Sequence, residues 1–169
     1  MFDLYFGAIY NRHAFLEQRF LGLMQAIETL HRRTSDATDV PPEDHERRLE
    51  EILHATPDEY RDWLSTRLEH SNELVLRKRL EDVLGRCPKV VTKLVKKRTF
   101  IHRVREGRNY LTHFDPSLEQ TAPMGSDLYR LTVQLQALVE MSVLLELGFA
   151  CEEIDAFFDR VGRYGHPHE

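Results

Sequence analysis

The chain of 169 residues is long enough for one domain with a substantial hydrophobic core, and its 41% hydrophobic and 30% charged residues exclude a disordered chain. The most apolar stretch, residues 135–149, contains Glu140 and Glu146, which excludes a membrane-spanning helix, and the N-terminus lacks the pattern of a signal peptide. The net charge of −5 argues by itself against nucleic-acid binding. We therefore expect a soluble protein that makes no contact with a membrane.

The only two cysteines, Cys87 and Cys151, lie far apart in the sequence. Two such thiols provide neither a disulfide framework nor a metal-binding cluster, so we expect a reducing, cytoplasmic environment and neither a metal nor a cofactor. His166 and His168 near the C-terminus resemble metal ligands, but a flexible tail over residues 166–169 is the better interpretation.

Apolar residues recur at helical spacing along the chain, and no alternating run typical of a strand occurs. The first long helix is predicted over about residues 11–33. Its apolar stripe consists of Leu16, Phe20, Leu23, Ile27 and Leu30. The other predicted helices cover about residues 42–54, 56–68, 71–85, 89–112, 126–148 and 151–164. The sequence thus predicts an all-α fold, a helical bundle of about five to seven helices that forms a single domain over residues 1–165.

Prolines mark several of the predicted helix boundaries. Pro42 suits a first helical turn, Pro88 follows a break after the fourth helix, and Pro116 ends the basic helix because the preceding Asp115 resists the α conformation. The helix over residues 126–148 is apolar on so wide a face that it is either fully buried or part of an oligomer interface.

Positive charge is concentrated between residues 77 and 108, which contain twelve lysines and arginines but only three acidic residues. This asymmetry fits a phosphate-binding face on an otherwise acidic protein. It fits equally well a pair of solvated basic helices, and charge alone does not distinguish the two interpretations.

Arg108 is an anomaly in the predicted basic helix, because the helical pattern places it on the apolar stripe between Val104 and Leu111. A guanidinium in a core or an interface is costly unless it meets a carboxylate or a bound anion. Glu28 on the first helix is the expected partner for a salt bridge, and a bound phosphate is the alternative.

Arg108 is followed by the polar Asn109, by three further residues and by His113. This arrangement resembles the R-polar-x(3–5)-H motif of the HEPN ribonucleases. The longer run RNYLTHFDPSLE, residues 108–119, is similar to the ApeA-type HEPN family, which is associated with bacterial anti-phage defence. Residues 19–33 resemble the first helix of that family, and residues 144–148 resemble its closing helix.

The resemblance implies an endoribonuclease effector of anti-phage defence, abortive infection or a toxin system. It would cleave RNA without a metal ion, by attack of the ribose 2′-hydroxyl, and leave a 2′,3′-cyclic phosphate and a 5′-hydroxyl. His113 would transfer protons, Arg108 would hold the phosphate, and Asn109 would orient the histidine or donate a hydrogen bond to the phosphate. Because one histidine cannot conveniently play both proton-transfer roles, and because HEPN proteins act as dimers, the resemblance also implies a homodimer.

Five residues along a regular helix correspond to about 500°, so Arg108 and His113 would point about 140° apart, and Thr112 would share the face of Arg108. The site therefore requires the helix to end or to distort near His113. Asp115 and Pro116 predict an end at that place.

Further residues are candidates for contacts with the substrate or with the catalytic residues. They are Glu28, His31, Arg105, Tyr110 and Thr112. Glu28 and His31 lie three residues apart and share a helix face, but an ordinary surface or core pair is an equally good interpretation.

Two other functions fit the same fold. One is a catalytically inactive helical domain that binds RNA or a protein or that dimerises, and the other is a nucleotide-binding or antitoxin-partner domain. Members of the ApeA type usually carry a further N-terminal region, so we expect an upstream sensor domain that is absent from this chain.

Overall fold

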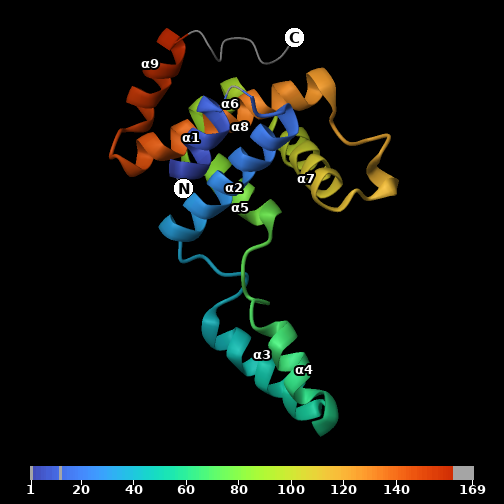
Figure 1. Cartoon of the computed structure of the whole chain (residues 1–169). Helices are drawn as coiled ribbons and strands as arrows, with labels where there is room; N and C mark the ends of the chain where they lie inside the picture. Colours follow the sequence, from blue (N-terminus) through green and yellow to red (C-terminus); the bar gives the residue numbers. More distant parts are fainter. Residues whose placement is uncertain (1, 12, 162–169) are drawn as a thin grey trace. The chain divides into compact units, whose positions relative to one another are not determined.

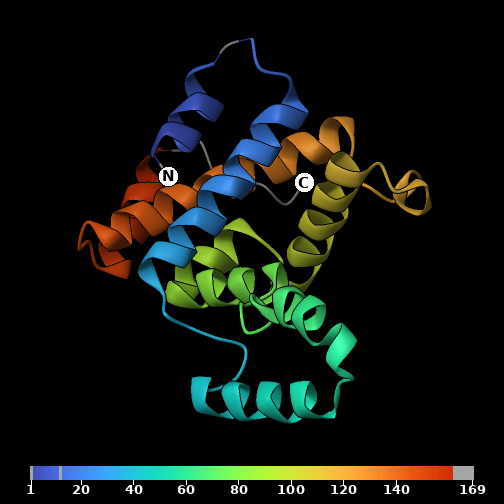
Figure 2. The ribbon, with the colours of Figure 1, turned by 60° about the horizontal axis from the view of Figure 1, so that its bottom comes forward.

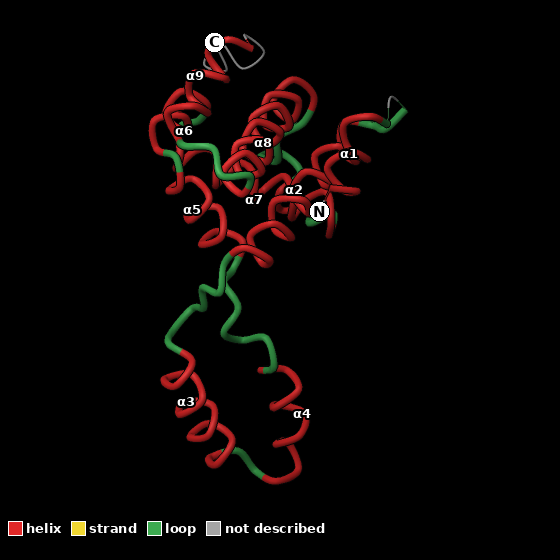
Figure 3. Tube along the Cα trace, turned by 90° about the vertical axis from the view of Figure 1, so that its left-hand side faces the viewer, coloured by secondary structure: helices red, strands yellow, loops and turns green. Residues whose placement is uncertain are grey.

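The computed structural model describes residues 2–11 and 13–161, and the predicted tail over residues 166–169 lies outside them (Figure 1). Within the described residues every regular element is a helix, as the tube in Figure 3 shows. The helices are α1 (Phe2–Tyr10), α2 (Leu16–Thr34), α3 (Pro42–Ala55), α4 (Asp58–Leu68), α5 (Leu76–Arg86), α6 (Pro88–Leu94), α7 (Lys97–His113), the 3₁₀ helix η1 (Pro116–Leu118), α8 (Gly125–Glu146) and α9 (Cys151–Val161).

The prediction of an all-α bundle is confirmed, but the nine α-helices in the described part of the chain exceed the five to seven predicted. One additional helix is α1, over residues for which the sequence pattern predicts no element. The other arises because the prediction of one helix over residues 89–112 is wrong. Val95, with φ −145° and ψ 149°, is extended and separates α6 from α7. Its side chain is nevertheless buried, so the apolar pattern continues although the helix stops.

The described helices fall into two compact units. The first unit consists of the described residues of 1–34 and 76–169 and contains α1, α2 and α5 to α9. The second unit consists of residues 35–75 and contains α3 and α4.

Helix α8 forms the centre of the first unit, and α2 packs across it (Figures 1 and 2). Leu135 and Leu138 of α8 and Phe20 and Leu23 of α2 are completely buried. Burial of a large aliphatic or aromatic side chain contributes about 1.5–3 kcal/mol to the free energy of folding. The wide apolar face of the predicted helix over residues 126–148 is therefore explained by burial inside this unit. In the described part of the chain, no helix combines the length and the apolar character that crossing a bilayer requires.

The second unit is a helical pair with little core of its own. No residue of α3 or α4 is buried, and Tyr60 and Trp63 on α4 are exposed. Pro42 occupies the first turn of α3, as predicted. The segments that flank the pair are tied together by Asn72, whose side-chain oxygen accepts from the backbone N–H of Val40 and whose amide nitrogen donates to the carbonyl of Val40.

A disulfide bond joins Cys87 to Cys151, and their Cα atoms lie 5.7 Å apart. The expectation of two separate thiols is therefore wrong for this structure. Cys87 immediately precedes α6 and Cys151 begins α9, and these two helices pack together. Two cysteines that are 64 residues apart in sequence meet because the fold places the starts of their helices side by side.

Reduction of this disulfide is expected to lower the free energy of unfolding by about 4 kcal/mol, because the bond closes a long loop in the unfolded chain. The measurement is chemical denaturation of the wild type with and without a reductant. The variant in which both cysteines are replaced by serine is the control and should not respond to the reductant. Equal midpoints for the oxidised and reduced wild type would contradict the expectation.

Candidate active site

Helix α7 is held against the first unit by one buried face. Phe100, Ile101, Val104 and Gly107 are its buried residues. Near the start of the helix, a guanidinium nitrogen of Arg103 lies 2.6 Å from a carboxylate oxygen of Asp127 at the start of α8. The opposite face of α7 is left for solvent and ligands.

Gly107, which precedes Arg108, lets the backbone of α7 approach Phe20 and Pro123 closely. A Cβ atom at this position would lie 3.0 Å from Cγ of Pro123 and 3.3 Å from Cζ of Phe20. Both distances are shorter than ordinary van der Waals contact, so the absence of a side chain lets the last turns of α7 pack against α2 and the loop before α8. Arg108, the next residue along the helix, is half-buried.

Arg108 and His113 meet through their side chains. Nη1 of Arg108 lies 3.4 Å from Nε2 of His113 and 3.4 Å from Oδ1 of Asn109. Helix α7 ends at His113, as predicted, and the next residue, Phe114, is left-handed with φ 50°. His113 itself is still helical, so no distortion turns it towards Arg108. The long arginine side chain instead crosses the exposed face of the helix, above Asn109.

The contact with Arg108 fits one tautomer of His113. A guanidinium only donates hydrogen bonds, so Nε2 of His113 must be the acceptor. The geometry therefore fits a neutral imidazole with its proton on Nδ1 and a free electron pair on Nε2. Such a nitrogen can accept a proton from a nearby hydroxyl group.

The segment after His113 is a turn built around Asp115. Its carboxylate accepts hydrogen bonds from the hydroxyl of Ser117 at 2.7 Å and from the backbone N–H of Ser117 at 2.9 Å. These two hydrogen bonds stabilise the ionised carboxylate and lower the pKa of Asp115. The ring of Phe114 is exposed, and its centroid lies 6.1 Å from that of Tyr110. Sequence reasoning used Asp115 only as a helix-ending signal and missed this role.

Of the site residues predicted on α7, Arg108, Asn109 and His113 make contact with one another, while Arg105, Tyr110 and Thr112 lie on the same helix. Arg105, Thr112 and His113 are exposed, and Arg108 and Asn109 are half-buried on the same helix. Tyr110 is half-buried beside Phe114. Among the described residues, no ion pair joins Arg108 to Glu28, which was the expected alternative partner.

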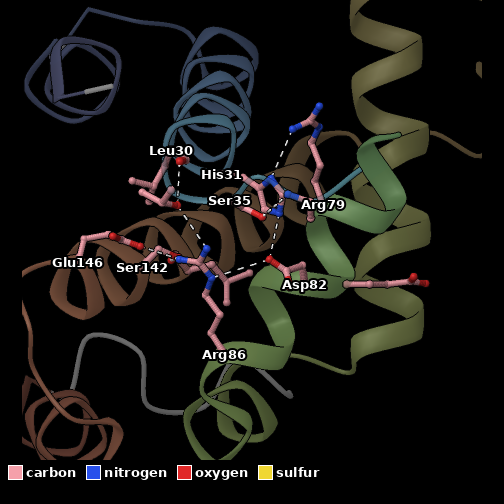
Figure 4. Close-up of polar contacts among 12 residues, drawn as sticks. Leu30, His31, Ser35, Arg79, Asp82, Arg86, Ser142 and Glu146 are labelled. Atoms are coloured by element: carbon pink, nitrogen blue, oxygen red, sulfur yellow. Dashed lines mark hydrogen bonds and ion pairs between the residues drawn. The ribbon is translucent and has the colours of Figure 1, made fainter. Parts of the chain in front are cut away.

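His31 lies in a different cluster, shown in Figure 4. It is buried on α2, and its Nε2 donates to a carboxylate oxygen of Asp82 at 3.0 Å, while its Nδ1 accepts from Arg79 at 3.4 Å. Beside this pair, Arg86 donates to Glu146 at 2.7 Å. These residues join α2, α5 and α8, and among the described residues no hydrogen bond or ion pair joins His31 to Arg108 or His113.

The sequence gives only a weak indication of the contact between His31 and Arg79. His31 lies four residues after Ile27 on the apolar side of α2, and Arg79 interrupts the apolar side of α5 beside Leu80 and Val83. Two polar residues at core positions of two helices predict a buried polar contact. Only the structure shows that they face each other.

The burial of His31 makes the stability depend on pH. Desolvation lowers the pKa of His31 from 6.5, and the neighbouring Arg79 and Arg86 act in the same direction, although Asp82 opposes them. Below about pH 6.5 the unfolded chain therefore binds a proton that the folded chain rejects. Stability conferred by the neutral His31 is complete above that pH and is lost as the pH falls.

In denaturant unfolding between about pH 7 and pH 5, the wild type should lose up to about 1.4 kcal/mol per pH unit more than His31→Gln. His54→Gln, at an exposed position on α3, is the matched control and should retain the wild-type slope. A slope for His31→Gln equal to that of the wild type would show that His31 does not titrate in this way.

Gly107→Val should lower the free energy of unfolding by about 1–3 kcal/mol, because the added side chain would overlap Pro123 and Phe20. Gly85→Val is the matched control, since a Cβ atom at Gly85 of α5 meets no atom within 4 Å. Thermal denaturation followed by circular dichroism measures both variants. Equal losses in the two variants would mean that helix propensity, not packing at Gly107, is responsible.

Within the described residues, no group of three or more His, Cys, Asp or Glu side chains is arranged to hold a metal ion. The model of the Apea-like HEPN family matches residues 21–153, which include α7 with Arg108 and His113. No curated protein and no solved structure matches the chain.

Proposed function

The chain belongs to the Apea-like HEPN family, and we propose that it is a metal-independent endoribonuclease with Arg108, Asn109 and His113 as its catalytic residues. The family supports the general class, because HEPN domains are generally ribonucleases. The observation that carries the specific proposal is the 3.4 Å contact between Nη1 of Arg108 and Nε2 of His113 at the end of α7. We further propose that the enzyme is an effector in anti-phage defence or in a toxin system.

The proposed reaction is an intramolecular transesterification. Nε2 of His113 takes the proton of the ribose 2′-hydroxyl, the 2′-oxygen forms a bond to phosphorus, and the bond from phosphorus to the 5′-oxygen breaks. A proton donor supplies the hydrogen of the leaving 5′-hydroxyl. The products are a 2′,3′-cyclic phosphate and a 5′-hydroxyl, and atoms and charge balance without a water molecule or a metal.

In the proposed reaction Arg108 binds the phosphate. A guanidinium carries a positive charge and can offer two parallel N–H donors to phosphate oxygens. In the structure, which holds no RNA, one guanidinium nitrogen, Nη1, contacts both Asn109 and His113. When a phosphate enters, Arg108 turns to it, so that Nε2 of His113 is released for the 2′-hydroxyl. Negative charge on the phosphorane then develops next to the positive charge of Arg108.

A second copy of the chain is proposed to supply the proton donor. One imidazole cannot be deprotonated to act as the base and protonated to act as the acid in the same step. Two copies that place their α7 ends at one phosphate provide two imidazoles and two guanidinium groups. The exposed Phe114, directly after His113, provides apolar surface for such a contact.

Arg108→Ala and His113→Ala should each lower the rate of RNA cleavage by about 10²–10⁴-fold, because each removes a group that acts in the transition state. The assay follows a labelled RNA in EDTA, and the wild type should leave a 2′,3′-cyclic phosphate. Arg48→Ala and His54→Ala, at exposed positions on α3, are matched controls and should cleave at the wild-type rate.

Cleavage by both Arg108→Ala and His113→Ala at the wild-type rate would refute the site. Cleavage by the wild type that stops in EDTA would refute the metal-independent mechanism. If the wild type binds RNA but leaves it intact, the catalytically inactive RNA-binding domain is the correct alternative.

A further inference from the structure

We propose that a groove between α5 and α7 binds the phosphate backbone of single-stranded RNA beside the bond that is cleaved. The inference rests on the proposed nuclease function and adds to it a binding site outside the catalytic residues. The two helices pack together, and the groove between them has a volume of about 670 Å³. The side chains with charge or titratable groups that line it are Arg77, Glu81, Lys97, Arg98, His102 and Arg105.

The groove carries unpaired positive charge. Its acidic residue, Glu81, is already paired with Arg77, whose Nε lies 2.9 Å from a carboxylate oxygen of Glu81. Lys97 lies close enough to donate to the backbone carbonyl of Glu81, which carries no formal charge. Arg98 and Arg105 are exposed, and neither forms an ion pair within the described residues. A surface with these groups attracts a polyanion.

The composition of the groove favours phosphate contacts over recognition of bases. Among the described residues that line it, none is phenylalanine, tyrosine or tryptophan. Proteins that hold the bases of a single strand stack them on such rings. Arginine and lysine bind phosphate oxygens whatever the base. The groove should therefore bind RNA with little preference for sequence.

The groove leads to the catalytic residues along one side of α7. Arg98, Arg105 and Thr112 follow one another at steps of seven residues, so they lie on the same side of the helix. Arg105 precedes Arg108 by one turn, and Arg98 lies about 15 Å from Arg108 along the helix axis. One phosphate cannot contact both Arg98 and Arg108. The ligand that uses both is a strand with several phosphates, with one end of its bound segment at His113.

The binding test uses the His113→Ala chain, which keeps RNA intact. Labelled oligouridylate and oligoadenylate of equal length are titrated by fluorescence anisotropy between roughly 50 and 200 mM salt. The added replacement Arg98→Glu should weaken binding of both about ten-fold at the lower salt concentration and reduce the salt slope by about 0.7 for each lost phosphate contact. Arg160→Glu, at an exposed position on α9, is the matched control and should bind as the parent does.

The cleavage test uses the otherwise native chain with Arg98→Ala and two substrates. A dinucleotide has one phosphate and cannot reach Arg98, so its cleavage rate should stay unchanged. Cleavage of a long single strand at low concentration should fall about ten-fold, in parallel with binding. Thermal denaturation confirms that the variant is folded.

Each outcome bears on the groove separately from the catalytic site. Equal RNA binding by the parent and Arg98→Glu would overturn the groove proposal, even if Arg108 and His113 prove catalytic. Equal losses for the dinucleotide and the long strand would also overturn it, because they would place Arg98 in the catalytic step. Tighter binding of polyglutamate or of duplex RNA than of the single strand would overturn the proposal that single-stranded RNA is the ligand of the groove. Binding that depends on Arg98, in a chain that does not cleave, would support the groove and refute the nuclease.

Discussion

The close packing of Gly107 against Phe20 and Pro123 holds the C-terminal half of α7 against α2 and the loop before α8. Phe20 belongs to the completely buried core of α2 and α8, so its ring cannot move aside without loss of packing. Pro123 belongs to the loop that leads into α8. The position of Arg108, one residue after this contact, is therefore coupled to the packed interior of the first unit. The proposed catalytic pair at the surface is thereby attached to a rigid part of the structure.

A buried hydrogen-bond cluster and a disulfide bond connect further helices of the first unit. The cluster around the buried His31 joins α2 to α5, and its neutral imidazole satisfies both Asp82 and Arg79. The disulfide between Cys87 and Cys151 joins the start of α6 to the start of α9. Helix α5, which the His31 cluster connects to α2, also forms one wall of the basic groove, while α7 forms the other. Helix α7 thus carries both a wall of the groove and the proposed catalytic pair.

Helical periodicity and boundary prolines were sufficient to predict the fold class and most helices. They were insufficient at Val95, because an extended residue with a buried apolar side chain leaves the apolar pattern unbroken. The contact between Arg108 and His113 was expected from the local sequence. Helical periodicity predicts where the two side chains start but not that the long Arg108 side chain can reach His113 without a distortion of the helix. The partners of His31 and of Cys87 lie far away in sequence. Tertiary packing brings such residues together, so the patterns in a single sequence were not enough to predict these pairs.

The central claim is that two chains act together on one phosphate. It is tested most directly by measuring the cleavage rate per chain over a range of protein concentrations, with the molecular mass determined at each concentration by sedimentation. The rate per chain should rise in proportion to the fraction of dimer and reach a plateau when dimerisation is complete. A monomer that cleaves RNA at the full rate per chain would contradict the claim.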